Sequence, residues 1–64
     1  MNELPEPLLL TVAEVARALN VGRTTVYGLM SSGQLGVCRI GRSVRVPVHS
    51  VRAYVQMLEM DIPI

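Results

Sequence analysis

Residues 11–33, TVAEVARALNVGRTTVYGLMSSG, carry the signals of two short helices joined by a tight turn. Thr11 and Glu14 form a capping box, the pattern in which each side chain accepts a hydrogen bond from the other residue's backbone amide. Apolar residues follow at helical spacing, namely Val12, Val15, Ala16 and Leu19. The first helix is predicted to end at Asn20, because asparagine tolerates the left-handed conformation and Gly22 follows closely.

The second helix is predicted to begin near Arg23, with Gly22 as a poor cap, and to end at Ser31-Ser32-Gly33. Its apolar residues are Val26, Leu29 and Met30. Ala16 supplies a small side chain where the second helix crosses the first, and Val21 is expected to be buried in the turn. Two helices joined by a three-residue turn at this spacing constitute a helix-turn-helix unit.

A β-hairpin and a third helix are predicted after this unit. Segments 37–40 and 44–46 are strand-like, and Gly41-Arg42-Ser43 between them is a turn signal. Alternation is expected to place Arg39 and Arg45 on one face of the hairpin, opposite its apolar residues, with Arg42 at the tip. Pro47 ends the second strand because it lacks an N–H donor. The third helix, from about Val48, carries apolar residues at helical spacing: Val48, Val51, Val55 and Leu58.

These elements predict a mainly α fold with a small β-hairpin, a winged helix-turn-helix of three helices and a two-stranded wing. We expect an N-terminal tail over residues 1–10, in which Leu8 to Leu10 tuck against the core, a winged helix-turn-helix domain over residues 11–58 and a C-terminal tail over residues 59–64. The predicted core consists of Val12, Val15, Ala16, Leu19, Val26, Leu29, Ile40, Val46, Val51, Val55 and Leu58.

The composition limits the kind of protein this is. A chain of 64 residues forms one domain, which buries only about 60% of the surface of its unfolded form. The single cysteine, Cys38, can form neither an intramolecular disulfide nor a structural zinc site, which favours a reducing cytoplasm. Acids and prolines occupy the N-terminus where a signal peptide carries basic residues, and the apolar runs are far shorter than the ~20 residues of a membrane span. We therefore expect a soluble, cytoplasmic protein.

The charges of the chain are divided between its middle and its ends. All six cationic residues are arginines that lie between Val15 and Leu58, a stretch without any acid: Arg17, Arg23, Arg39, Arg42, Arg45 and Arg52. The five acids lie outside it: Glu3, Glu6, Glu14, Glu59 and Asp61. This division suggests an anionic partner for the middle of the chain, and planar arginine suits phosphates and guanine edges. The alternative is that the arginines only solvate a small surface.

The second helix has an outward face suited to DNA. At 100° per residue, Thr24, Gly28 and Ser31 point away from the core, while Arg23 with Tyr27 lies on one flank and Thr25 on the other. A small, polar, acid-free face can lie in a major groove, and the helix N-terminus directs free amides at phosphates. We expect Thr24 and Tyr27 to meet bases, and Arg23, Thr25 and Arg45 to hold phosphates. The alternative is an ordinary solvated face.

The wing offers a second contact through Arg39, Arg42, Ser43 and Arg45. A basic hairpin can reach the adjacent minor groove, whose negative potential favours an inserted arginine, and Arg42 is expected to enter it. The alternative is a hairpin edge blunted by charge against aggregation.

The chain resembles the excisionase family of DNA-binding domains, which is related to the MerR-like winged helix-turn-helix proteins. The resemblance lies in LLTVAEVA (residues 9–16), VGRTTVY (residues 21–27) and RIGRSVRVP (residues 39–47). It implies that Arg23 to Tyr27 belong to the recognition helix and Arg39 to Arg45 to the wing. Excisionases bind and bend attachment-site DNA and direct a phage-type integrase to excise the element, and a free-standing chain favours this role. A small transcriptional regulator is the alternative that the resemblance leaves open.

One position departs from that family. The residue after Tyr27 is often basic there, whereas here it is Gly28, so we expect weak binding to a single site and cooperative self-association of several copies side by side on DNA. The apolar tail from Met57 to Ile64 could also dock on an integrase or a neighbouring copy, or else cover the protein's own core. We expect no catalysis, cofactor or metal site, because neither His49 nor Cys38 has partner residues that suit such chemistry.

Overall fold

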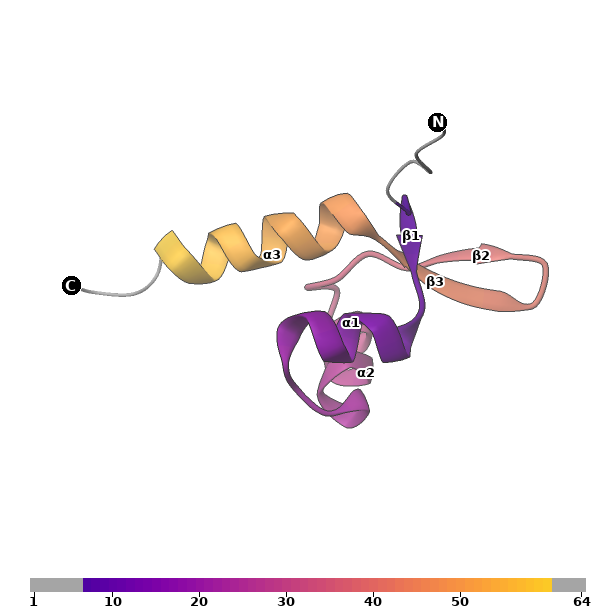
Figure 1. The fold of residues 1–64 in the computed structure, drawn as a ribbon, viewed down its shortest axis with the longest axis horizontal. Helices are drawn as coiled ribbons and strands as arrows, with labels where there is room; N and C mark the ends of the chain where they lie inside the picture. Colours follow the sequence, from indigo (N-terminus) through magenta and orange to yellow (C-terminus); the bar gives the residue numbers. More distant parts are fainter. Residues whose placement is uncertain (1–6, 61–64) are drawn as a thin grey trace, which may run out of the picture.

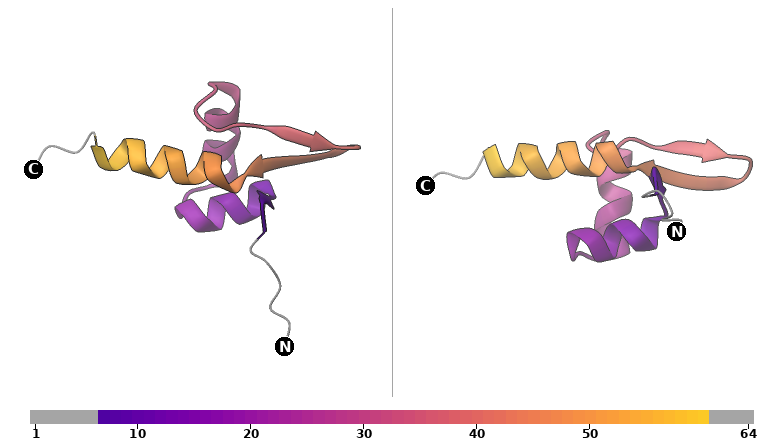
Figure 2. Two further views of the ribbon diagram at one scale, coloured as in Figure 1. Left: turned by 90° about the horizontal axis from the view of Figure 1, so that it is seen from above. Right: turned by 45° about the horizontal axis from the view of Figure 1, so that its top comes forward.

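The structure is a computed structural model in which residues 7–60 are described. Strand β3 connects all parts of this structure. Its elements are β1 (Leu9–Leu10), α1 (Val12–Leu19), α2 (Arg23–Ser31), β2 (Cys38–Ile40), β3 (Ser43–Pro47) and α3 (Val48–Met60). The strands are antiparallel in the order β1-β3-β2. Three helices with a wing confirm the predicted fold class. The wing and α3 leave the pair of α1 and α2 in opposite directions (Figures 1 and 2).

Helix α1 begins and ends as its sequence predicts. The Thr11 amide donates to Glu14 Oε1 at 2.8 Å, and the Glu14 amide donates to Thr11 Oγ1 at 3.1 Å, so the capping box is complete. Asn20 ends the helix in the left-handed conformation with φ 60°. Because the chain reverses there, the Val21 amide can donate to the Ala16 carbonyl at 3.0 Å. This turn sets the angle between α1 and α2.

The end of α2 organises the loop that follows it. Gly33 adopts φ 83°, as expected for a glycine that stops a helix. The Leu29 carbonyl then accepts hydrogen bonds from the amides of Gln34 at 2.9 Å and Leu35 at 3.1 Å. These bonds turn Leu35 into the core, where 1% of its surface is exposed. No helical or strand period marks this position, so the sequence pattern gave no sign that it is buried.

Leu9 and Leu10 form a strand that the sequence pattern did not predict. Leu9 pairs with Pro47 and Leu10 with Val46, and the Val48 amide donates to the Leu8 carbonyl at 2.9 Å. A strand of two residues shows no alternation, so its sequence gives no signal. The strand forms because β3 has a free edge, and the backbone N–H and C=O groups on that edge pair with those of Leu9 and Leu10.

The register of the hairpin corrects one prediction. Cys38 pairs with Arg45, Arg39 with Val44 and Ile40 with Ser43, and residues paired across antiparallel strands lie on the same face. Arg39 therefore shares a face with Val44, while Arg45 lies on the other. The expectation that Arg39 and Arg45 share a face is wrong. The turn has only two central residues, Gly41 with φ 59° and Arg42. Ser43 belongs to β3 and not to the turn, which shifts the pairing by one position.

The core differs from the predicted one in some of its members, and its buried residues come from the three helices, from β3 and from the loop after α2. Its buried side chains are Val15, Ala16, Val26, Leu35, Val46 and Val51, with Leu10, Val12, Leu19, Leu29, Met30 and Tyr54 packed around them. Three predicted core residues are instead exposed: Ile40 by 62%, Leu58 by 42% and Val55 by 36%. Val21, expected to be buried in the turn, is exposed as well. Ile40 lies near the tip of the wing, and Val55 and Leu58 lie beyond the part of α3 that reaches the core.

Helix α3 packs through its first half and projects with its second. Val51 is buried, and the Ser50 hydroxyl accepts a hydrogen bond from the Gly36 amide at 2.6 Å, which ties the helix to the loop before β2. The helix runs to Met60, two residues beyond the predicted domain end at Leu58. Residues 1–6 and 61–64, most of the two predicted tails, lie outside the described residues. Within residues 7–60, every helix is too short or too polar to cross a membrane.

We predict that Thr11→Ala lowers the free energy of unfolding by about 1 kcal/mol, because it removes the side-chain acceptor of the N-cap. Thr11→Ser keeps that acceptor and serves as the control. Urea unfolding followed by far-UV circular dichroism measures both variants. Equal stability of Thr11→Ala and the parent chain would show that the capping box adds nothing to folding.

Candidate nucleic-acid interface

The outward face of α2 is exposed to solvent. Val26 is buried and fixes the orientation of the helix. All six residues predicted for the interface on this helix are exposed: Arg23, Thr24, Thr25, Tyr27, Gly28 and Ser31. Tyr27, the largest of them, exposes 54% of its surface. The structure therefore brings these six residues together on one helix as a small, polar face with one cation and no acid.

Gly28 leaves an open position in the middle of this face. A Cβ atom placed on it would have no heavy atom within 4 Å among the described residues. Packing therefore does not require a glycine here. Since glycine destabilises a helix interior by ~1 kcal/mol relative to alanine, Gly28 has an energetic cost that no contact among residues 7–60 explains.

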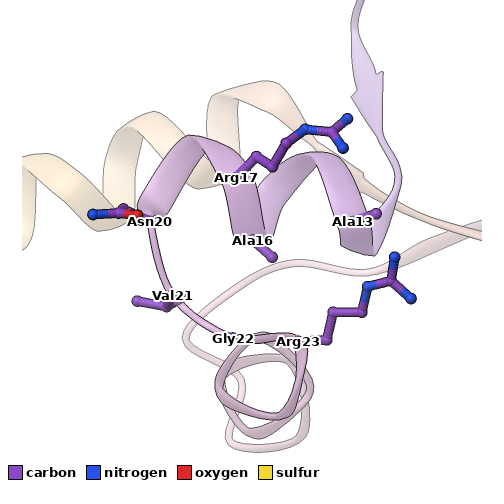
Figure 3. A pocket seen from close by; sticks show the side chains of 7 residues that line it. All are labelled: Ala13, Ala16, Arg17, Asn20, Val21, Gly22 and Arg23. Atoms are coloured by element: carbon purple, nitrogen blue, oxygen red, sulfur yellow. The ribbon is translucent and has the colours of Figure 1, made fainter.

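A hollow at the N-terminus of α2 adds a second feature. It is lined by Ala13, Ala16, Arg17, Asn20, Val21, Gly22 and Arg23 (Figure 3). The N-cap Gly22 makes no side-chain hydrogen bond to the helix, so the first amides of α2 lack that partner. Arg17 and Arg23 extend their guanidinium groups toward the same side of the hollow. Two arginines beside a helix N-terminus form an electropositive surface suited to a phosphate.

Arg17 is a candidate site residue that the sequence analysis did not select. It lies in the last turn of α1, and only the crossing of α1 and α2 brings it beside the same hollow as Arg23. The concentration of arginines in the middle of the chain pointed to this region in general. The helix crossing, which depends on the Asn20 turn, was needed to select Arg17.

Arg45 is held against its own strand and close to α1. Its Nη1 donates to the Val44 carbonyl at 2.8 Å, and the side chain is half-buried. The pKa of Glu14 is lowered, chiefly by the hydrogen bond from the Thr11 amide and additionally by the positive charges of Arg17 and Arg45. Continuing the β1–β3 register by one residue places Arg45 across from Thr11, which explains its proximity to the Glu14 carboxylate. Glu14 therefore offsets part of the charge of both Arg17 and Arg45.

The rest of the wing presents its cations to solvent. Arg39, Arg42 and Ser43 are exposed, and Arg42 occupies the turn. The wing's predicted site residues thus do not form one cluster: Arg42 lies at the tip, Arg39 on one face and the partly shielded Arg45 on the other. The exposed cations of the wing are therefore Arg39 and Arg42, both near its end.

Over residues 7–60, no group of three or more His, Cys, Asp or Glu side chains is placed to hold a metal ion. Cys38 is half-buried at the base of the wing, with its thiol free. Neither observation adds a group to the candidate interface.

Comparison with known proteins yields one family and several relatives. A family model described as a helix-turn-helix domain matches residues 9–58. The chain is 44% identical over 57 residues to a protein named "Probable excisionase" from Saccharopolyspora erythraea, a match that covers 89% of the chain and 58% of that protein. It is 44% identical over 50 residues to a protein named "Excisionase" from Streptomyces ambofaciens, covering 78% of the chain and 81% of the relative. The chain thus spans less than two thirds of the first of these relatives.

Proposed function

The chain belongs to the excisionase-related family of helix-turn-helix domains, and on that premise we propose that it binds double-stranded DNA in a sequence-specific manner as an excisionase. The observation that carries the proposal is the acid-free exposed face of α2, which ends in a hollow flanked by Arg17 and Arg23. Sequence-specific binding to a duplex needs both the helix face and the hollow, because base edges are read in the major groove and phosphate contacts fix the register of the protein.

In this proposal α2 lies in the major groove with its first turn toward the bases. Thr24 and Tyr27 meet base edges, where a hydroxyl can donate or accept and an aromatic ring can contact a thymine methyl group. Arg23 and the first amides of α2 hold a phosphate at the hollow, to which Arg17 adds its charge. Thr25, on the other flank of the helix, holds a second phosphate. Gly28 and Ser31 line the groove without a charged contact.

The wing reaches the neighbouring minor groove, with Arg42 inserted and Arg39 and Ser43 near the backbone. Arg45, expected to hold a phosphate, makes a weaker contact, because its guanidinium is engaged by the Val44 carbonyl and its side chain is half-buried. The protein then grips the duplex at two adjacent grooves, and binding to both favours bent DNA.

As an excisionase the protein performs no chemistry itself. It bends attachment-site DNA so that a phage-type integrase can excise the element, and it works where that DNA lies, in the nucleoid. A transcriptional regulator would use the same surface, and the two roles differ in their product. Excision of an element by its cognate integrase, measured with and without the protein, distinguishes them, since only a directionality factor raises the yield of excised circles.

We predict that Arg42→Ala weakens DNA binding and lowers the slope of log K against log salt by about one unit for each phosphate that the arginine neutralises. Binding is measured by fluorescence anisotropy at several salt concentrations, on duplexes selected with the parent protein from a random-sequence pool.

Arg45→Ala provides the matched control within the same hairpin, and we expect it to lower both affinity and slope less than Arg42→Ala does. Unchanged binding of Arg42→Ala at every salt concentration would refute the contact between the wing and DNA.

We also predict that Gly28→Arg tightens DNA binding by about tenfold at low salt, which corresponds to ~1.4 kcal/mol. The position is exposed and open, so the new guanidinium can reach a phosphate without disturbing the core.

Gly28→Ala is its control, because both substitutions stabilise the helix while alanine adds no charge. Equal affinities of the two variants would place this face of α2 away from DNA.

The second half of α3 supports a further contact, with a neighbouring copy of the chain on DNA. Val55, Met57 and Leu58 continue the side of α3 that packs on the core through Val51 and Tyr54, but they remain exposed. We refer to these three residues as the α3 stripe. Because α3 and the wing project in opposite directions (Figure 1), copies aligned along a duplex can bring the α3 stripe of one against the next. Such contact offsets weak single-site binding.

We predict that Leu58→Gln abolishes cooperative binding to a duplex with two adjacent selected sites and leaves single-site affinity unchanged. Gln56→Ala, on the polar side of the same helix, is the control and retains cooperativity. Full cooperativity of Leu58→Gln would exclude the α3 stripe as the contact between copies. If that variant loses only integrase-dependent excision, the integrase is the occupant of the stripe instead.

A further inference from the structure

Ile40 is the most exposed apolar residue of the wing. It exposes 62% of its surface, more than Val37 at the base of the hairpin. It pairs with Ser43 immediately before the turn. The wing's contribution to the buried core comes from Val46, at the other end of β3. The side chain of Ile40 therefore adds little to the packing of the protein, and its exposure to water is unfavourable.

The surroundings of Ile40 are cationic. Arg39 precedes it and Arg42 follows it by two residues, both of them exposed. The hairpin carries all three away from the body of the molecule (Figure 2). The Arg39 side chain lies on the opposite face of the hairpin from Ile40, so the cation next to Ile40 is Arg42 in the turn. An apolar side chain beside an arginine, at the end of a projecting hairpin, matches the surface of a minor groove. Phosphates line the rims of that groove, and deoxyribose and base edges form its interior.

The shape of the side chain suits insertion. A β-branched residue is stiff at χ1, so it loses little conformational freedom when it becomes wedged. Proteins that insert isoleucine, leucine or methionine between base steps from the minor groove partly unstack those steps and kink the duplex.

We propose that Ile40 is a DNA-bending wedge, which enters the minor groove beside Arg42 and partly unstacks one base step. The inference rests on the proposed function, because it requires that the wing meets DNA. It assigns to Ile40 the part of the bend that arginine contacts alone do not produce. Arg42 enters the groove beside Ile40, Arg39 contacts the DNA backbone from the other face of the hairpin, and Ile40 opens the step.

The experiment compares Ile40→Ala with the parent chain on a single selected duplex that carries a fluorescent dye at each end. We expect Ile40→Ala to keep its thermal transition, since the side chain is exposed, to lose most of the bend seen by energy transfer, and to bind about tenfold less tightly. Val37→Ala, an exposed apolar residue at the base of the hairpin, is the matched control and keeps the bend. Ile40→Leu keeps it as well.

A second readout separates a wedge from a general weakening of the interface. A mismatched step placed within the wing's footprint is easier to unstack, so we expect the parent chain to bind that duplex more tightly than the matched one. Ile40→Ala should gain nothing from the mismatch. A full bend with Ile40→Ala, or an equal gain from the mismatch, would overturn the wedge.

The failure of the proposed function gives a different result. If the parent chain shows no salt-dependent binding to any selected duplex, then the proposal that the protein binds DNA is wrong. The proposal that Ile40 is a wedge is then wrong as well. If Ile40→Ala bends a single site normally and loses only cooperativity between two sites, the residue contacts a neighbouring copy, and the wedge is overturned while DNA binding stands.

Discussion

Backbone pairing on both edges of β3 is the constraint on which the rest of the structure depends. β1 occupies one edge and β2 the other, Val46 enters the core from the middle of the strand, and Pro47 leads directly into α3. A chain this short has few buried side chains with which to join a helix pair, a hairpin and a third helix. β3 joins them by hydrogen bonds, which fix the direction in which the wing leaves the helices. The spacing of the two proposed DNA contacts depends on that direction.

Local chemistry made most of the fold predictable. The Thr11–Glu14 capping box, the left-handed Asn20 and the positive φ of Gly33 each act within a few residues, so their positions in the sequence set the ends of the helices. Pairing over long distances was not predictable in the same way. Two leucines before α1 become a strand because β3 has a free edge, and Leu35 enters the core because the end of α2 turns it inward. None of these three leucines belongs to a periodic pattern.

The candidate site likewise has one part that local pattern predicts and one part that depends on long-range pairing. The exposed face of α2 is set by helical periodicity once Val26 is placed in the core, and the sequence was sufficient to predict it. The wing depends on register, and assigning Ser43 to the strand moves Arg39 and Arg45 to opposite faces. Arg45 then lies near the Glu14 carboxylate, and the positive charges of Arg45 and Arg17 help to lower the pKa of that carboxyl. The outward charge of the wing is consequently concentrated at its tip, and Ile40, an expected core residue, is exposed beside it.

The central claim is that α2 and the wing form a single surface for duplex DNA. A titration of the isotope-labelled protein with a selected duplex at low salt, followed by backbone amide chemical shifts, tests this most directly. We expect the amides of the first turn of α2 and of the wing tip to shift together along one saturation curve, while those on the polar side of α3 stay in place. Shifts in only one of the two regions, or saturation at clearly different concentrations of duplex, would contradict the claim.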